Sequence, residues 1–383
     1  MINKFVPYGR HVVDADDIAA IVEVMQGDWL TTGPWVDRFE QAFAQLVDAR
    51  YAVAASSGTA ALHLCMLAAG IGENDEVIVP ALTFAASANC ARYVGAKIVF
   101  ADVRPDTLTI DTATLEALIT PRTRAIVCVD YAGLPSDLDE LRQLAERHEL
   151  VLIEDACHSP GAAYRGKKVG SIAHLTAFSF HPVKHLTTAE GGMVTTDNMA
   201  YLERLRRLRN HGIDSDHRKR ETQGTWEYDM VDLGFNYRLN DVQCALGLSQ
   251  LRKFPQNIER RRILAKKYAE ALGSSPRLRI QSVPEDRVHA WHLYVVRLTG
   301  EDPGESRRRV FSALRQDQIG VNVHYLPVYL HSYYRKLGYP VGLCPVAEHA
   351  YSGLLSLPMW HGLTDTDQSR VIDCLMTAVR RYA

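Results

Sequence analysis

The chain has 383 residues, of which 47% are hydrophobic and 23% are charged, and its formal net charge is −2. This composition excludes a disordered chain and predicts a large core and two domains. The 43 basic and 45 acidic side chains nearly cancel, and no long basic stretch occurs, so we expect no nucleic acid partner.

Seven cysteines are scattered along the chain without a CxxC pair. Neither a disulfide framework nor a metal site is therefore expected, and a reducing cytoplasm is the predicted location. The amino terminus lacks the apolar core of a signal peptide, and no run of about eighteen apolar residues occurs. We predict a cytoplasmic protein without a membrane partner.

Short apolar runs alternate with helical patterns over the first two thirds of the chain. They predict strands at residues 51–54, 77–80, 98–101, 125–131, 150–154, 175–180 and 193–196. A helix is expected over residues 136–145, with Ser136 as its cap. This alternation predicts a mostly parallel sheet with helices on both faces. The basic run His217–Arg220 predicts a loop, either as solvated surface or in contact with a diphosphate.

A continuous helical pattern from Leu239 to Leu272 predicts a connector between two domains. A strand at 292–298 and a helix at 305–318 follow it. We therefore predict an α/β protein with a large domain over residues 1–250 and a small α+β domain over residues 251–383.

Three features separated in the sequence together indicate a pyridoxal phosphate site. Lys184 follows an apolar strand, Asp155 ends another, and Ser57-Gly58-Thr59 opens a helix. The cofactor needs an amine for its Schiff base, a carboxylate to keep its ring nitrogen protonated, and backbone N–H groups for its phosphate. Each feature alone is also typical of a surface lysine or a helix cap. Ser179, five residues before the lysine, is a further expected phosphate donor.

Four motifs occur in one order: Glu154–His158, Ser179–Lys184, Glu190–Gly192 and Gly234–Arg238. With them, the chain resembles the nucleotide-sugar aminotransferases of the DegT/DnrJ/EryC1/StrS family over nearly its whole length. Members of that family have the fold-type I architecture of aspartate aminotransferase, with a mixed, mostly parallel sheet in the large domain.

The resemblance implies a role for each matching residue. Lys184 would form the Schiff base and move the proton, and Asp155 would pair with the ring nitrogen. His158 stands where many members carry glutamine beside the ring hydroxyl. Asn236 would reach the phosphate of a neighbouring subunit, which implies a homodimer with shared active sites. The full set of expected cofactor-binding residues is Lys184, Asp155, Ser57, Gly58, Thr59, Phe84, His158, Ser179 and Asn236.

The resemblance also implies that L-glutamate and a nucleotide-linked keto sugar are the substrates. The residues expected to contact the sugar are Thr31, Thr32, Arg238, His324, Tyr325 and Tyr329. Packing is the alternative role for the histidine and the tyrosines, and Arg238 could instead support a turn.

Segments 129–133, 184–192 and 233–241 resemble the family members that act in pseudaminic acid biosynthesis, the UDP-4-amino-4,6-dideoxy-N-acetyl-β-L-altrosamine transaminases. The substrate would then be a UDP-linked 4-keto-6-deoxy-N-acetylhexosamine. Another 3- or 4-keto sugar linked to GDP, dTDP or UDP is the alternative. Some sugar dehydratases of this fold group replace the lysine with histidine, so Lys184 favours transamination. A nicotinamide enzyme would need a Gly-x-Gly-x-x-Gly turn, which is missing after the early strands.

Overall fold

Seven strands form the central sheet of the computed structural model, which describes residues 4–215 and 217–383. Their order across the sheet is β1-β9-β8-β5-β4-β2-β3. In chain order they are β1 (Tyr51–Ala55), β2 (Glu76–Pro80), β3 (Lys97–Ala101), β4 (Thr123–Val129), β5 (Val151–Asp155), β8 (Leu175–Ser179) and β9 (Gly192–Thr196). Each coincides with a predicted strand to within two residues at either end.

The direction of the strands places three predicted site segments at one edge of the sheet. Strands β3, β2, β4, β5 and β8 are paired in parallel. Strand β9 is antiparallel to both β8 and β1, so β1 runs in the same direction as β8. The carboxyl ends of β1, β5 and β8 therefore meet, and ligands of open α/β sheets bind at that edge.

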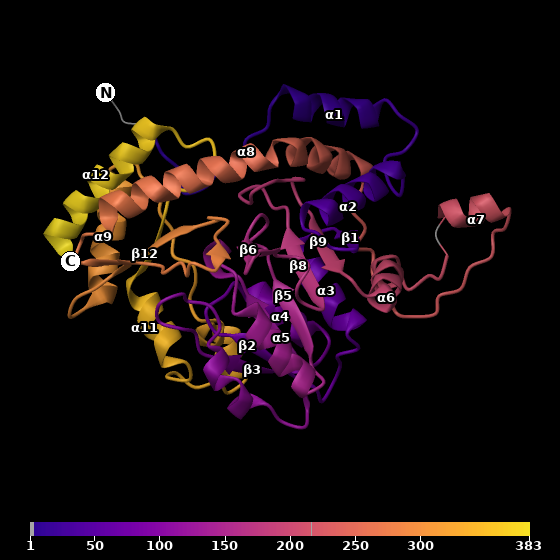
Figure 1. Ribbon diagram of the computed structural model, residues 1–383, viewed down its shortest axis with the longest axis horizontal. Coiled ribbons are helices and arrows are strands. Elements are labelled where there is room, and N and C mark those ends of the chain that lie inside the picture. The colour runs from indigo at the N-terminus through magenta and orange to yellow at the C-terminus, as the bar shows by residue number, and fades with distance from the viewer. Residues whose placement is uncertain (1–3, 216) are drawn as a thin grey trace.

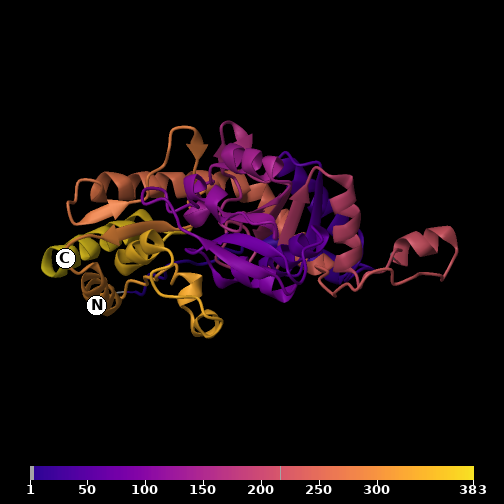
Figure 2. The same cartoon turned by 90° about the horizontal axis from the view of Figure 1, so that it is seen from below.

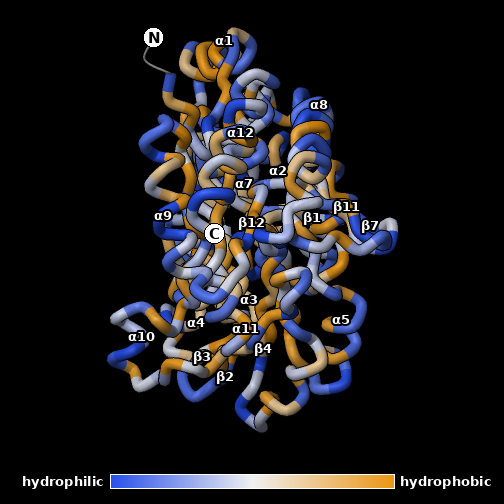
Figure 3. The backbone as a smooth tube through the Cα atoms, turned by 90° about the vertical axis from the view of Figure 1, so that its left-hand side faces the viewer, coloured by the Kyte–Doolittle hydropathy of each residue, from blue (hydrophilic) through white to orange (hydrophobic). Residues whose placement is uncertain are grey.

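Helices cover both faces of this sheet, whose central strands are largely hydrophobic (Figure 3). Helix α3 packs on β8 and β9, and α2 packs on β1. The flanking helices are α2 (Pro34–Leu46), α3 (Gly58–Ala68), α4 (Ala85–Tyr93), α5 (Leu138–Arg147) and α6 (Met199–Arg209).

The predicted cap at Ser136 is wrong. Helix α5 begins at Leu138 with Asp137 as its N-cap, and the Asp137 side chain makes no capping hydrogen bond. Ser136 instead donates from Oγ to the Val129 carbonyl at 3.1 Å, because its backbone lies beside the end of β4. The serine thus ties the loop to the strand.

Helix α8 (Asp241–Leu272) extends along the top of the molecule in Figure 1. Asn240 caps it by accepting the Gln243 N–H at 2.9 Å. The buried carboxylate of Asp241 accepts the backbone N–H groups of Gly33 and Trp35 at the start of α2. Helix α1 (Ala15–Met25) packs along the same helix.

The last third of the chain forms a second core around a three-stranded antiparallel sheet of order β10-β12-β13. Val6 pairs with Ile319 there, since its N–H donates to Gln318 O and its carbonyl accepts the Gly320 N–H. The predicted boundary at residue 250 falls inside α8, and the division into two domains stays a prediction.

The remaining elements are β6 (Ala163–Tyr164), β7 (Lys167–Lys168), β10 (Leu278–Ile280), β11 (Arg287–Val288), β12 (Tyr294–Leu298), α9 (Pro303–Gln316), α10 (Ser332–Lys336), α11 (Pro345–Gly353), β13 (Leu354–Leu357) and α12 (Asp365–Tyr382), with short 3-10 turns at Thr112–Thr114, Glu116–Leu118, Tyr131–Gly133 and Val328–Leu330.

Residues 211–215 and 217–235 form an arm that projects away from the body of the molecule (Figures 1 and 2). The prediction of a loop at 217–220 is wrong, because helix α7 (His217–Gln223) forms there. Its arginine, glutamate and glutamine side chains lose little freedom in a helix, which explains the difference. Several apolar side chains of the arm are exposed, namely Trp226, Tyr228, Met230, Val231 and Leu233.

Among the described residues, none of the helices combines the length and the hydropathy that crossing a bilayer requires. The same part of the chain contains no group of three or more His, Cys, Asp or Glu side chains arranged to hold a metal ion.

Candidate active site

A cavity of about 500 Å³ lies at the carboxyl edge of the central sheet. It brings together segments from β1, β5 and β8 with a loop of the C-terminal third. Of the residues predicted from the sequence, it is lined by Ser57, Gly58, Thr59, Phe84, Asp155, His158, Ser179, Lys184, His324 and Tyr325.

The carboxylate of Asp155 is buried at the end of β5 and held in one orientation. Its Oδ2 accepts the Ser87 hydroxyl at 2.6 Å, and its Oδ1 accepts the Cys157 N–H at 3.1 Å. Because Ser87 donates to the carboxylate, the Thr83 hydroxyl donates to Ser87 at 2.7 Å. Both carboxylate oxygens are thus anchored from the protein side.

The Lys184 amine lies in the same cavity, and its pKa is shifted from that of an ordinary lysine. Burial lowers the pKa of this amine below its ordinary value, Cys157 and Asp155 oppose that shift, and Arg261 adds to it. A lowered pKa increases the fraction of unprotonated amine, which is the form that attacks carbonyl carbons and accepts protons.

The turn that opens α3 is shaped by close backbone packing. Ser57 is the N-cap, and its Oγ accepts the Ala60 N–H at 3.1 Å. A Cβ atom on Gly58 would lie 2.8 Å from the Cβ of Ser179, and one on Gly192 would lie 2.4 Å from the Ser57 carbonyl oxygen. Glycine at these positions therefore lets β8 and β9 approach the turn, whose first N–H groups have no partner within the helix.

Aromatic side chains form the opposite wall of the cavity. Phe84 is 56% exposed, so it is not an ordinary core residue, and its ring lies 5.8 Å from that of Tyr325. The Tyr325 hydroxyl is 3.2 Å from His158 Nε2. His158 is buried, and burial, with a further contribution from Lys184, lowers its pKa well below the ordinary value, so the imidazole is neutral.

Two residues of the expected sugar-binding loop differ in their environment. His324 lines the cavity and its Nδ1 lies 2.8 Å from the Ser356 hydroxyl. Tyr329 is fully buried, and its hydroxyl donates to Glu348. The structure therefore gives Tyr329 a packing position away from the cavity.

Besides Tyr329, four of the predicted residues lie outside the cavity in a single chain. Thr31 and Asn236 are exposed at the surface. Thr32 and Arg238 line a second hollow of about 680 Å³, where Arg238 donates to Asn210 Oδ1 at 2.7 Å. This hollow, here called the arginine hollow, is also lined by Arg206, Arg207, Arg209 and Arg218.

Sequence reasoning missed several residues of the cavity. Tyr8 and Asn322 reach it from distant segments, and Ser87 acts through Asp155. Cys157 and His181 lie inside motifs that were recognised, so their neighbours could have indicated them. Glu190 and His292 also line the cavity.

The residues present fit pyridoxal phosphate. They offer an amine with a lowered pKa, a carboxylate anchored at both oxygens, and a helix N-terminus flanked by hydroxyls, all facing one cavity. These are the groups that the aldehyde, the ring nitrogen and the phosphate of the cofactor require.

The model of the DegT/DnrJ/EryC1/StrS aminotransferase family matches residues 11–376. The chain belongs to this family. The spore coat polysaccharide biosynthesis protein SpsC of Bacillus subtilis is 39% identical over 381 residues, which cover 99% of this chain and 98% of that protein.

Solved structures agree with this assignment. Spr1654 of Streptococcus pneumoniae in its PMP form has a TM-score of 0.94 at 31% identity, covering 99% of this chain and 100% of that one, and the PLP form has 0.93. PseC of Helicobacter pylori, an aminotransferase involved in the biosynthesis of pseudoaminic acid, has a TM-score of 0.91 at 30% identity with the same coverage as the PMP form. The predicted family, fold class and class of pyridoxal phosphate-dependent aminotransferase are confirmed.

Proposed function

We propose that this aminotransferase moves the amino group of L-glutamate to the keto carbon of a nucleotide-linked sugar, with a UDP-linked 4-keto-6-deoxy-N-acetylhexosamine as the first substrate to test. The observation that carries the proposal is the meeting of Lys184, Asp155 and the Ser57–Thr59 turn in one cavity. The names of the relatives SpsC and PseC, which refer to a polysaccharide and a sugar acid, support a sugar as acceptor.

Pyridoxal phosphate, when bound, supplies the aldehyde that takes up the amino group and the ring that withdraws electrons from the donor's Cα. Lys184 then removes the Cα proton with its unprotonated amine and returns it on the other side of the transfer. Asp155, whose carboxylate is held by Ser87 and Cys157, would pair with the ring nitrogen of the bound cofactor. Ser57, Thr59 and Ser179, which line the cavity, would hold the phosphate of the cofactor.

The same residues act in reverse when the sugar ketone is the acceptor. The amino group is then released to the keto carbon, and Lys184 delivers the proton to that carbon. A single base on one wall of the cavity adds the proton from one face, so it sets the configuration of the new amine. Phe84, His158 and Tyr325 cover the other sides of the cavity.

A two-step absorbance experiment tests the reaction. L-glutamate should convert the yellow enzyme to its pyridoxamine form, and after removal of the donor a panel of 3-keto and 4-keto nucleotide sugars should restore the original spectrum. Restoration by the UDP-linked 4-keto-6-deoxy-N-acetylhexosamine alone supports the first candidate. Restoration by another sugar would keep the aminotransferase reaction and assign the enzyme to a different biosynthetic pathway. Failure of glutamate to bleach the enzyme would contradict the donor and favour a sugar dehydratase.

We also propose that the active enzyme is a homodimer in which each chain contributes Asn236 to the cavity of the other. The exposed apolar side chains of the arm support a second copy as the occupant of that surface, since soluble monomers rarely expose such clusters. Replacing Trp226 and Leu233 by serine should convert the dimer to a monomer in analytical ultracentrifugation. The matched control is Val341→Ser, because Val341 is also exposed but lies far from the arm in the sequence.

A further inference from the structure

Asn236 directly follows the arm, and backbone hydrogen bonds on both sides of it fix its place on the body of the molecule. The Phe235 carbonyl accepts the His211 N–H at 2.9 Å, and the Tyr237 N–H donates to the Arg209 carbonyl at 3.0 Å. Asn236 itself is exposed. The short segment 235–237 is therefore attached to the end of α6 while its central side chain faces outward.

The two neighbours of Asn236 pack on the opposite side of this segment. Asn236 forms an antiparallel β-bridge, and successive side chains of an extended backbone point to opposite sides. The rings of Phe235 and Tyr237 are stacked with their centroids 5.0 Å apart and their planes at 13°. Both contact the ring of His63, at centroid distances of 4.9 Å and 5.8 Å. These three rings thus keep the segment from rotating and hold Asn236 away from the body.

His63 lies on α3, the helix that opens with the Ser57–Thr59 turn, and is 5% exposed. Its Nδ1 is 3.1 Å from the Tyr237 hydroxyl. The Tyr237 carbonyl accepts the N–H of Ser56 at 2.8 Å, and Ser56 directly precedes the turn. Tyr237 is therefore bonded to both the start and the middle of the helix that faces the cavity of its own chain.

We propose that Tyr237, held by His63, is a positioning residue for Asn236, so that α3 of each chain serves two cavities. It serves its own cavity through the Ser57–Thr59 turn and that of the neighbouring chain through Asn236. This inference rests on the proposed homodimer in which Asn236 is shared. Loss of the Tyr237 side chain then weakens cofactor binding in the other chain, whereas a tyrosine that only fills space beside α3 would affect its own chain.

Mixed dimers of two differently tagged full-length chains provide the test. One chain carries Lys184→Ala, so the absorbance of lysine-bound pyridoxal phosphate reports only the cavity of the other chain. Tyr237→Ala is placed either on the Lys184→Ala chain or on the chain that retains Lys184. The two proteins contain the same substitutions and differ only in which chain carries the change at position 237.

Tyr237→Ala on the Lys184→Ala chain should raise the dissociation constant of pyridoxal phosphate at least about threefold, because the phosphate loses a well-placed hydrogen bond. The same change on the chain that retains Lys184 should leave that constant unchanged. Tyr237→Phe keeps the ring and removes the bond to His63, so it should give a smaller increase in the same arrangement. The matched control is Tyr333→Ala, which alters an exposed tyrosine of α10 and should change nothing on either chain.

An effect of Tyr237→Ala that is equal on the two chains, confined to its own chain or absent would overturn the positioning role. If this variant does not fold, Tyr237→Phe decides by the same comparison. Asn236→Ala, placed in the same two ways, separates this failure from that of the proposed sharing. An effect of Asn236→Ala only from the Lys184→Ala chain keeps the sharing, whereas an effect on its own chain, or chains that do not associate, contradicts it.

Discussion

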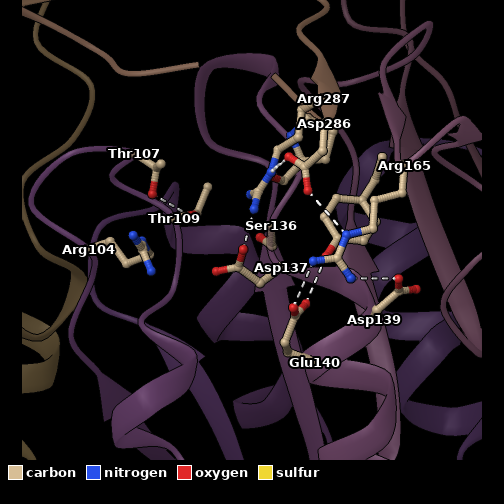
Figure 4. Close-up of polar contacts among 12 residues, drawn as sticks. Arg104, Thr107, Thr109, Ser136, Asp137, Asp139, Glu140, Arg165, Asp286 and Arg287 are labelled. Atoms are coloured by element: carbon tan, nitrogen blue, oxygen red, sulfur yellow. Dashed lines mark hydrogen bonds and ion pairs between the residues drawn. The ribbon is translucent and has the colours of Figure 1, made fainter. Parts of the chain in front are cut away.

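Arg165 lies at the surface among three carboxylates, whereas Arg261 lies in the interior with none among the described residues. Arg165 donates to Asp139 and Glu140 at 3.0 Å and to Asp286 at 3.2 Å (Figure 4). Water screens such exposed pairs, so the many partners of Arg165 contribute little to stability. The charged side chains and the neutral histidine rings around the cavity are buried, and the protein interior screens their charges less than water does. Of these two arginines, the exposed one therefore has the more complete ion pairing.

Among the substitutions proposed here, removal of the Lys184 side chain in the cavity should have the largest effect on activity. Lys184→Ala should lower the rate of the glutamate half-reaction by roughly 10³-fold or more, because the proton acceptor is lost. The change is measured by stopped-flow absorbance. Lys168→Ala is the control, since Lys168 is an exposed lysine paired with Asp48, and a comparable loss in that variant would contradict the assignment.

Substitution of Asp155 should come next in size. Asp155→Asn should retain part of the cofactor but slow the half-reaction by about 10²-fold, because the amide does not keep the ring nitrogen protonated. Ser87→Ala removes one anchoring hydrogen bond and should give a smaller decrease in the same assay. Near-normal turnover of Asp155→Asn would refute its role.

The neutral histidines predict a dependence of stability on pH. Burial lowers the pKa of His289 to about 3 and that of His324 to about 4. The unfolded chain binds protons below about pH 6.5 and the folded chain does not, so this contribution is complete above that pH and is lost as the pH falls toward these values. Each such group should remove about 1.4 kcal/mol of unfolding free energy per pH unit in that range.

Urea denaturation at several pH values between about 7.5 and 5 measures this slope. His289→Gln should flatten it, because the amide does not titrate. A free energy of unfolding that is constant over this range would show that these rings are already solvated in the folded state.

The exposed network should respond least. Arg165→Ala should lower the midpoint of thermal unfolding by about 2 °C or less at low ionic strength, and by less still in high salt. Differential scanning calorimetry at two salt concentrations measures both values. A large loss that salt does not reduce would mean that Arg165 acts through its contact with the Tyr164 ring rather than through charge.

The sheet and the centre of the cavity could be predicted because their signals are local. Each strand of the central sheet is a short apolar run; Asp155 ends one of these strands, and Lys184 lies five residues after the end of another. Once the strands are parallel, their ends meet, so adjacency at the site follows from the pattern.

The rest of the site depends on contacts between distant segments, for which the sequence has no local signal. Ser87 faces Asp155 only because α4 follows β2, which is separated from β5 by β4, and His292 reaches the cavity through the fold of the C-terminal third. Arg261 looks like any arginine of a basic helical stretch. Its burial is decided by the segments that pack on α8. The helix at 217–223 was missed because flanking glycines masked the favourable propensity of the residues between them.

The pairing of Val6 with Ile319 has a consequence for synthesis of the protein on the ribosome. Tyr8, two residues further on, lines the cavity, and its carbonyl accepts the Met359 N–H. A nascent chain that has already exposed Lys184 and Asp155 still lacks the partners that fix this segment, because Ile319 and Met359 are translated much later. The wall around the cofactor is therefore completed only after residue 359 has been synthesised, and stable uptake of the cofactor should follow that point rather than accompany the earlier growth of the chain.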